Sequence, residues 1–250
     1  MRYGPAMDED GHFGEPIAAR YDQSIADMTG PDVVDPAVDL LAQLAGDGQA
    51  LELGIGTGRI ALPLARRGVR VHGIDLSRAM AARLRDKPGG DAIGVTIGDF
   101  ATTVVPGRFS LAYLVFNTIM NLTAQDAQVA CFRNAAAHLQ PGGCFVIEVM
   151  VPELRKLPGG QNAVPFQVTP GRWAFDLYDT ATQAMSSNYV EVSGGRGEYR
   201  SIPFRYVWPA ELDLMAQLAG MRLRDRWAGW TRAPFTSDSH EHVSVWQKPG

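Results

Sequence analysis

The chain has 250 residues, of which 46% are hydrophobic and 20% charged, so it can form a real core and wholesale disorder is excluded. The formal net charge of −4 lacks the basic excess that is typical of nucleic-acid binders. Residues 1–47 hold ten acidic and two basic side chains, which concentrates the negative charge at the start. Two cysteines without a C-x-x-C pair, and an acidic start without an apolar signal segment, predict a cytoplasmic protein with no membrane span.

The first predicted element with a clear boundary is a helix. Asp35-Pro36 is typical of a helix start, with the aspartate as its cap, and predicts a helix that runs to about Ala45. Strands are then predicted at 50–53, 69–74, 93–97, 109–116 and 144–149, and helices at 59–66, 77–85 and 124–139, the last capped by Thr123. Strands that are separated by helices predict βαβ units and a parallel sheet.

The pattern changes after Met150. Strands predicted at 174–177, 187–192 and 199–207 have no helix between them, so an antiparallel insert is expected. A helix at 210–219 and strands at 222–227 and 242–246 are expected to complete the main sheet. The predicted organisation is therefore a helical cap (1–47), a core (48–151), a lid insert (152–208) and a C-terminal part of the core sheet (209–250).

The strongest motif is the glycine-rich segment 51–59 (Leu-Glu-Leu-Gly-Ile-Gly-Thr-Gly-Arg), which lies between a predicted strand and a predicted helix. Asp75 ends the next strand, 21 residues after Gly54, where a carboxylate can accept hydrogen bonds from two ribose hydroxyls. The spacing G-x-G-x-G differs from the G-x-G-x-x-G of dinucleotide-binding proteins, and no G-x-x-x-x-G-K-[ST] segment occurs. The alternative is a merely tight turn, with Asp75 as the cap of the following helix.

Together with segments 73–77 (Gly-Ile-Asp-Leu-Ser), 98–100 (Gly-Asp-Phe) and 139–143 (Leu-Gln-Pro-Gly-Gly), this motif resembles the class I S-adenosylmethionine-dependent methyltransferases. The resemblance implies a Rossmann-like α/β fold, with a seven-stranded, mostly parallel sheet whose last strand is antiparallel. It also implies S-adenosylmethionine as the cofactor.

The resemblance carries over the cofactor contacts by position. The glycine loop and its neighbours meet the methionine part, Asp75 holds the ribose, and Leu76 packs on the adenine. Asp99 and Phe100 lie at the adenine amino group, and Tyr21 closes the site. The full implied set is Tyr21, Glu52, Gly54, Ile55, Gly56, Gly58, Arg59, Asp75, Leu76, Asp99, Phe100, Phe116 and Asn117. Two alternatives stay open: Tyr21 as a packing residue of an N-terminal helix, and Asp99 as a simple loop acid.

The segment 115–121 after the fourth strand helps to separate the classes of methyl acceptor. Asn117 is not followed by the Pro-Pro of amino-methylating DNA enzymes, and the segment has no acid for a catechol-type metal site. It also lacks the cysteine of RNA C5 enzymes and the glutamate pair of protein arginine enzymes. Small molecules and peptides remain as the possible classes of methyl acceptor.

The aromatic residues favour a compact acceptor. Thirteen of the 22 lie between Phe166 and Trp246, either as walls of a cavity under the insert or as the core of the insert and a dimer contact. Similar lids occur in N-methyltransferases of amino sugars, amino acids and peptide N termini.

The sequence thus predicts direct in-line methylation of a small molecule, at an amine nitrogen because a neutral amine needs positioning and desolvation but no protein base. Tyr21 and Asn117 are expected to orient the acceptor, His240 is a candidate base, and no metal, nucleic acid or membrane partner is expected. O-methylation, a non-catalytic S-adenosylmethionine-binding subunit, an NAD-dependent oxidoreductase and a homodimer through the insert are the options kept open. The acidic cap is expected to fold over the cofactor, and its field to favour cations, so that neutralising Asp22 and Asp27 weakens binding.

Overall fold

The computed structural model describes residues 10–250, so the first nine residues of the predicted cap lie outside the described residues. Its main sheet has seven strands and confirms the predicted fold class. In spatial order they are β10 (Arg222–Trp227), β11 (Glu241–Gln247), β5 (Leu139–Met150), β4 (Phe109–Leu114), β1 (Gln49–Leu53), β2 (Arg70–Asp75) and β3 (Gly94–Ile97). The pairs from β5 to β3 are parallel, whereas β11 runs antiparallel to both of its neighbours.

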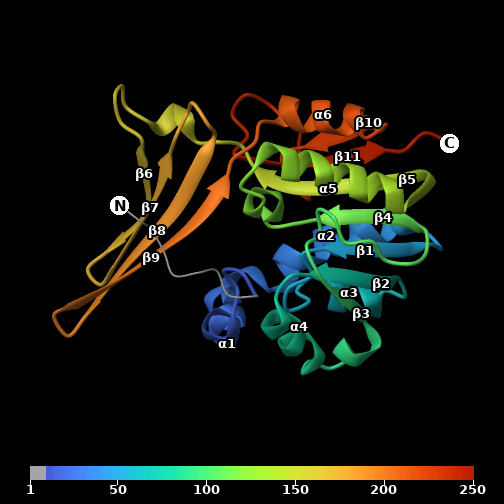
Figure 1. Ribbon diagram of the computed structural model, residues 1–250, viewed down its shortest axis with the longest axis horizontal. Helices are drawn as coiled ribbons and strands as arrows, with labels where there is room; N and C mark the ends of the chain where they lie inside the picture. The colour runs from blue at the N-terminus through green and yellow to red at the C-terminus, as the bar shows by residue number, and fades with distance from the viewer. Residues whose placement is uncertain (1–9) are drawn as a thin grey trace.

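Helices cover both faces of the main sheet, as the near-continuous apolar run of β4 requires (Figure 1). Alternate residues of β1 enter different clusters: Ala50 packs with α2 (Pro31–Ala45) and α3 (Ala61–Arg66), and Leu51 packs with α5 (Gln125–His138) and α6 (Pro209–Leu218). The helix α4 (Arg78–Arg85) begins at its cap Ser77 and contacts α1 (Glu15–Ser24). The helices therefore bury both faces of the sheet, and the ends of its strands remain available for a functional site.

A second sheet of four antiparallel strands follows β5 in the chain. It consists of β6 (Ala163–Thr169), β7 (Arg172–Tyr178), β8 (Ala184–Ser193) and β9 (Arg196–Arg205), in that spatial order. Figure 1 shows it standing beside the main sheet in yellow and orange, with α1 between the two. The predicted insert contains three of these strands, and β6 was missed because Pro165 and an irregular register at Pro165 and Gln167 obscure its alternation.

Two predicted helix starts were wrong. The helix α2 begins at Pro31 after Gly30, a full turn before Asp35-Pro36, and it accommodates Pro36 inside. Both prolines match the start signature, and the earlier one sets the boundary, since a single missing N–H can be tolerated. The helix α5 has Ala124 at its cap position, so Thr123 caps nothing. Among residues 10–250, no helix has the length and apolar character that crossing a bilayer requires.

Candidate active site

The glycine-rich segment forms a tight loop between β1 and α3. Gly54, Gly56 and Gly58 have φ angles of +79°, +55° and +80°, a region that residues with a Cβ atom rarely adopt. A Cβ atom on Gly54 would stand 2.6 Å from Thr118 Cγ2, and one on Gly58 would stand 2.2 Å from Leu84 Cδ1. The loop is therefore pressed against neighbouring elements, and only glycine permits this approach.

Asp75 ends β2 directly beside this loop. Its carboxylate accepts a hydrogen bond from the Gly56 N–H at 2.6 Å and one from the Ser77 N–H at 2.8 Å. Burial raises the pKa of Asp75, and the two backbone N–H groups counteract this effect. A carboxylate has about four acceptor positions, so Asp75 keeps capacity for a ligand while it fixes the loop.

A cavity of about 250 Å³ opens at these strand ends, and we call it the Asp75 cavity. Among residues 10–250, its wall contains carboxylates and aromatic rings but neither lysine nor arginine, which suits a sulfonium cation without phosphate, as in S-adenosylmethionine. The lining residues are Asp10, Gly11, His12, Phe13, Tyr21, Gly54, Gly56, Asp75, Leu76, Met80, Asp99, Phe100, Thr118, Asn121 and Leu122.

A second cavity of about 440 Å³ lies between α1, the ends of β4 and β5, and the second sheet; we call it the second-sheet cavity. It shares four lining residues with the Asp75 cavity, namely Phe13, Tyr21, Thr118 and Asn121. The two cavities therefore adjoin at these four side chains, which we call the junction. Aromatic and aliphatic side chains form most of the second wall, including Ile17, Ile25, Met28, Phe116, Met120, Met150, Phe166, Met185, Ile202 and Phe204.

Tyr21 reaches the junction from α1. Its ring lies edge-on to Phe13, with 6.1 Å between the ring centroids. Burial raises the pKa of Tyr21 above its usual value of 10.0, so its hydroxyl is neutral at ordinary pH. The residue can therefore shape the junction and donate a hydrogen bond there.

The chain turns abruptly after β4. Phe116 and Asn117 have φ angles of +59° and +60°, two successive non-glycine residues in the left-handed region. The Phe116 N–H donates to the Glu148 carboxylate at 2.8 Å, and the Asn117 side-chain oxygen accepts from the Met150 N–H at 2.7 Å. These bonds to β5 hold the strained turn so that both side chains line the second-sheet cavity.

The structure places most of the sequence-predicted residues at these two cavities. Seven of them line the Asp75 cavity: Tyr21, Gly54, Gly56, Asp75, Leu76, Asp99 and Phe100. Phe116 and Asn117 line the second-sheet cavity, together with Tyr21. Sequence reasoning did not single out Phe13 or Thr118 for the site. Thr118 belongs to the short 3₁₀ turn η3 (Thr118–Asn121), and Phe13 carries no local motif.

Four predicted cofactor residues lie elsewhere. Ile55 packs across the loop, since a Cβ atom on Gly73 would stand 2.4 Å from Ile55 Cδ1. Gly58 and Arg59 line a different pocket, and Arg59 lies 5.0 Å above the Phe116 ring and donates to the Met28 carbonyl. Glu52 is 2% exposed beneath the loop, where it accepts from the Tyr113 hydroxyl at 2.9 Å. These residues support the loop rather than line the Asp75 cavity.

His240 is not brought together with Tyr21 and Asn117. Its side chain is 68% exposed, and its Nδ1 atom lies 2.8 Å from a carboxylate oxygen of Glu153. It is absent from the lining of both cavities, and in the part of the chain that the structure describes no three His, Cys, Asp or Glu side chains gather as a metal site.

Glu52 makes the stability of the protein depend on pH. Desolvation by burial raises its pKa from 4.5 to about 8, so the folded chain keeps a proton that the unfolded chain releases. This contribution to stability is fully present below pH 4.5 and is lost as pH rises to about 8.

Glu52→Gln keeps an acceptor for Tyr113, and its melting temperature at pH 8.5 is expected to exceed that of the wild type by several degrees. Scanning fluorimetry measures the melting temperature of the wild type and of Glu52→Gln across this pH range, with Glu198→Gln as the control at an exposed position. Curves for the wild type and Glu52→Gln that stay parallel at all pH values would contradict the prediction.

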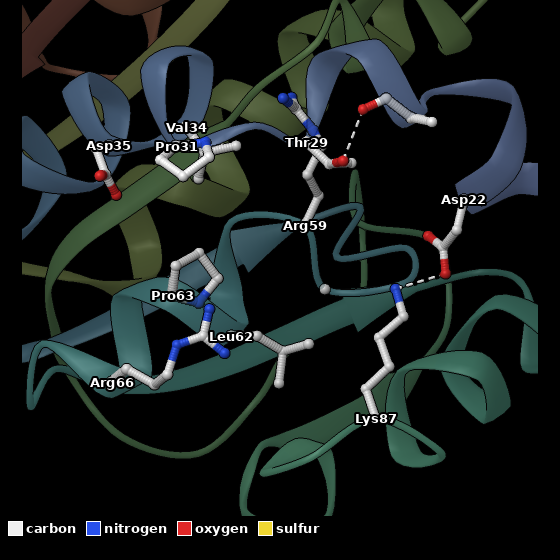
Figure 2. A pocket seen from close by; sticks show the side chains of 12 residues that line it. Asp22, Thr29, Pro31, Val34, Asp35, Arg59, Leu62, Pro63, Arg66 and Lys87 are labelled. Carbon is white, nitrogen blue, oxygen red and sulfur yellow. Dashed lines mark hydrogen bonds and ion pairs between the residues drawn. The ribbon is translucent and has the colours of Figure 1, made fainter.

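The helix α1 is tied to the back of the glycine loop at the pocket in Figure 2, which has a volume of about 400 Å³. Asp22 accepts from the Thr57 hydroxyl at 2.6 Å and pairs with Lys87 at 2.7 Å, the pair drawn as a dashed line. Lys87 also donates to the Thr57 carbonyl at 2.8 Å. The charge of Asp22 therefore acts through specific contacts that hold Tyr21 at the junction.

Asp22→Ala is expected to weaken S-adenosylmethionine binding about five- to tenfold, the worth of one charge-assisted hydrogen bond in a half-exposed site. Asp27→Ala is the matched control, because Asp27 is exposed in the turn η1 (Ala26–Met28) and has no side-chain bond within residues 10–250. Calorimetry of both variants at low and high salt separates two explanations. Equal losses that vanish in salt would show that the general field of the acidic segment acts instead.

Comparisons with known proteins agree with this geometry. A family model described as "Methyltransferase domain" matches residues 50–143. The chain is 26% identical over 244 residues to the cypemycin N-terminal methyltransferase of a Streptomyces species, covering 91% of this chain and 99% of that protein. The CcbJ methyltransferase from Streptomyces caelestis is 35% identical, with a TM-score of 0.85 over 97% of this chain and 100% of that chain.

A third similarity concerns the fold. CalS10, an amino pentose methyltransferase from Micromonospora echinaspora solved with S-adenosylmethionine bound, has a TM-score of 0.67 at 20% identity, covering 91% of this chain and 96% of that chain. The glycine loop, the carboxylate that ends β2 and the full-length similarity to CcbJ lead to one conclusion. The chain belongs to the class I S-adenosylmethionine-dependent methyltransferases and is an enzyme that uses S-adenosylmethionine as its cofactor.

Proposed function

We propose that this methyltransferase transfers its methyl group in line to the amine nitrogen of a compact acceptor that occupies the second-sheet cavity. The observation that carries the proposal is the junction, where the two cavities share Phe13, Tyr21, Thr118 and Asn121. When bound, the cofactor supplies an electrophilic methyl group on a sulfonium. A displacement at carbon needs the acceptor in line and close, with water excluded, and two adjoining cavities of this kind meet that need.

Each group of residues has a distinct part in this proposal. Asp75 would hold the ribose, and Asp99 with Phe100 would receive the adenine. Tyr21 and Phe13 would close the junction against water, with Asp22 holding α1 in place. Asn117, fixed through its bond to the Met150 N–H, would orient the acceptor. The enzyme then works by positioning and desolvation, without covalent chemistry of its own.

Nitrogen is the proposed target because a neutral amine brings its own lone pair, whereas a hydroxyl requires a base at the moment of transfer. Among the described residues that line the second-sheet cavity, there is no histidine, and Asp176 is the one carboxylate. The names of two similar proteins, the cypemycin N-terminal methyltransferase and an amino pentose methyltransferase, support an amine target. The concave, largely apolar wall of this cavity favours a small molecule or the end of a peptide over a nucleic acid. A homodimer stays a prediction, which light scattering tests.

The test uses cofactor with a ¹³C-labelled methyl group, purified enzyme and pools of amino sugars, amino acids and short peptides. The carbon shift of the product separates N-methyl from O-methyl groups. We expect a labelled N-methyl product in amounts equal to the S-adenosylhomocysteine formed, and none with Gly54→Val, whose side chain would collide with Thr118. Label on oxygen, or tight cofactor binding with no transfer to any pool, would overturn the proposal.

A further inference from the structure

The second sheet turns one face toward the second-sheet cavity. Side chains alternate along a strand, so Arg172 and Asp176 of β7 share this face, as do Ser187 and Tyr189 of β8. Arg200 of β9 joins them, and Arg172, Asp176 and Arg200 are the charged side chains among the described residues that line the cavity. Among the described residues, every charged side chain that lines the second-sheet cavity therefore comes from this face of the second sheet.

The two arginines stand at the mouth of the cavity, because they also line an outer groove of about 240 Å³. Their guanidinium carbons lie 5.5 Å (Arg172) and 4.8 Å (Arg200) from the ring centre of Tyr189. Arg172 Nε also lies 3.8 Å from a carboxylate oxygen of Glu191, and Glu198 lines the same groove. Both guanidinium groups thus contact the Tyr189 ring, and within residues 10–250 Arg172 also forms an ion pair, with Glu191.

Asp176 is different. Its carboxylate accepts one hydrogen bond, at 2.6 Å, from the hydroxyl of Ser187, which lies opposite it in the register of β7 and β8. Within residues 10–250 it belongs to no ion pair. Burial raises the pKa of Asp176, the direction expected of a carboxylate that apolar side chains surround without a counter-charge. Most of its acceptor positions therefore remain for a ligand.

We propose that Asp176 is the specificity-determining residue of the acceptor site, and that it receives a protonated amine of the acceptor while Ser187 fixes the carboxylate. The acceptor class is then a compact ammonium compound with apolar bulk for the rest of the cavity. This assignment rests on the proposed function, since it names the acceptor chemistry of the same site. It concerns the binding of the cationic acceptor, which is the form that simple amines take at neutral pH. The bound ammonium loses one proton to water before the transfer, so the nucleophile is the neutral amine of the proposed function.

The test compares benzylamine with benzyl alcohol, which match in shape and differ in charge. Dissociation constants are measured by NMR titration of enzyme saturated with S-adenosylhomocysteine, so that the Asp75 cavity is filled and cannot take up the cation. The wild type is expected to bind benzylamine about tenfold more tightly than the alcohol, the worth of a charge-assisted hydrogen bond in a partly desolvated site. Asp176→Asn is expected to bind the two probes alike, with the affinity for the alcohol unchanged.

The matched control is Glu198→Gln, which removes the same charge from an exposed position of the same sheet and should keep the preference. Ser187→Ala should lower the preference in part, and it tests the assignment even where Asp176→Asn folds poorly. Equal affinities of the wild type for both probes, no measurable binding of either, or an undiminished preference in Asp176→Asn would overturn the assignment. An equal loss in Glu198→Gln would also overturn it, by showing a long-range field.

The two proposals fail in distinguishable ways. Methyl label on oxygen overturns the proposed amine target, whatever the probes show. A preference for benzylamine that survives the loss of Asp176 overturns the role of this residue, even where the labelled product is an N-methyl amine.

Discussion

Asp75→Ala is expected to lower the affinity for S-adenosylmethionine at least about 100-fold in titration calorimetry, since hydrogen bonds to a charged acceptor are worth about 1.5–3 kcal/mol each. The variant loses the carboxylate that faces the cavity and also the two backbone bonds that hold Gly56 and Ser77. Loss of the carboxylate removes the proposed contacts to the ribose, and loss of the two backbone bonds lets the glycine loop relax. Both effects act in the same direction.

Two further variants separate these contributions. Asp75→Asn keeps one oxygen acceptor of similar shape, so it should recover part of the affinity. Asp91→Ala removes an exposed acid from the turn η2 (Gly90–Ala92), which precedes β3 at the opposite end of the parallel strands, and should leave binding unchanged. Wild-type affinity in a folded Asp75→Ala variant would remove the cofactor from this cavity.

Tyr21→Ala is expected to lower kcat/KM for methyl transfer about 100-fold, the cost of misplacing reacting groups by roughly an ångström. The ring lines both cavities and packs edge-on to Phe13, so its removal opens the junction to water. Cofactor affinity should fall much less, because the groups assigned to the ribose and adenine stay in place. A large fall in kcat/KM with a small change in cofactor affinity is the result expected of a residue at the junction.

Two variants of the same helix complete this test. Tyr21→Phe keeps the ring and removes the hydroxyl, so its rate shows whether the hydroxyl itself orients the acceptor. Gln23→Ala changes an exposed position of α1 and should leave the rate unchanged. Equal rates for Tyr21→Ala and the wild type would mean that Tyr21 is only a packing residue of the helix.

The parts of the site that depend on local geometry could be predicted from the sequence. The glycine loop needs φ angles that favour glycine, and Asp75 follows from the end of a strand that pairs with β1. The bounds of β10 match the predicted 222–227, because turn residues delimit this strand on both sides. These signals act over a few residues and need no knowledge of tertiary packing.

Other parts depend on contacts that a sequence does not display. Glu52 lies inside β1, opposite Gly73 and Tyr113, so its side chain points to a face of the sheet and not beyond the strand end. Asp176 faces the cavity only because β7 presents that face to α1 and the main sheet. His240 is likewise exposed away from both cavities, where its side chain contacts Glu153, 87 residues away in the chain.

A crystal structure of the enzyme with bound S-adenosylmethionine tests the central claim most directly. The account predicts the ribose hydroxyls at Asp75, the adenine beside Asp99 and Phe100, and the methyl carbon at the junction, facing the second-sheet cavity. A methyl group that faces a closed protein wall, or a cofactor bound in the reverse orientation with its adenine at Tyr21, would contradict it.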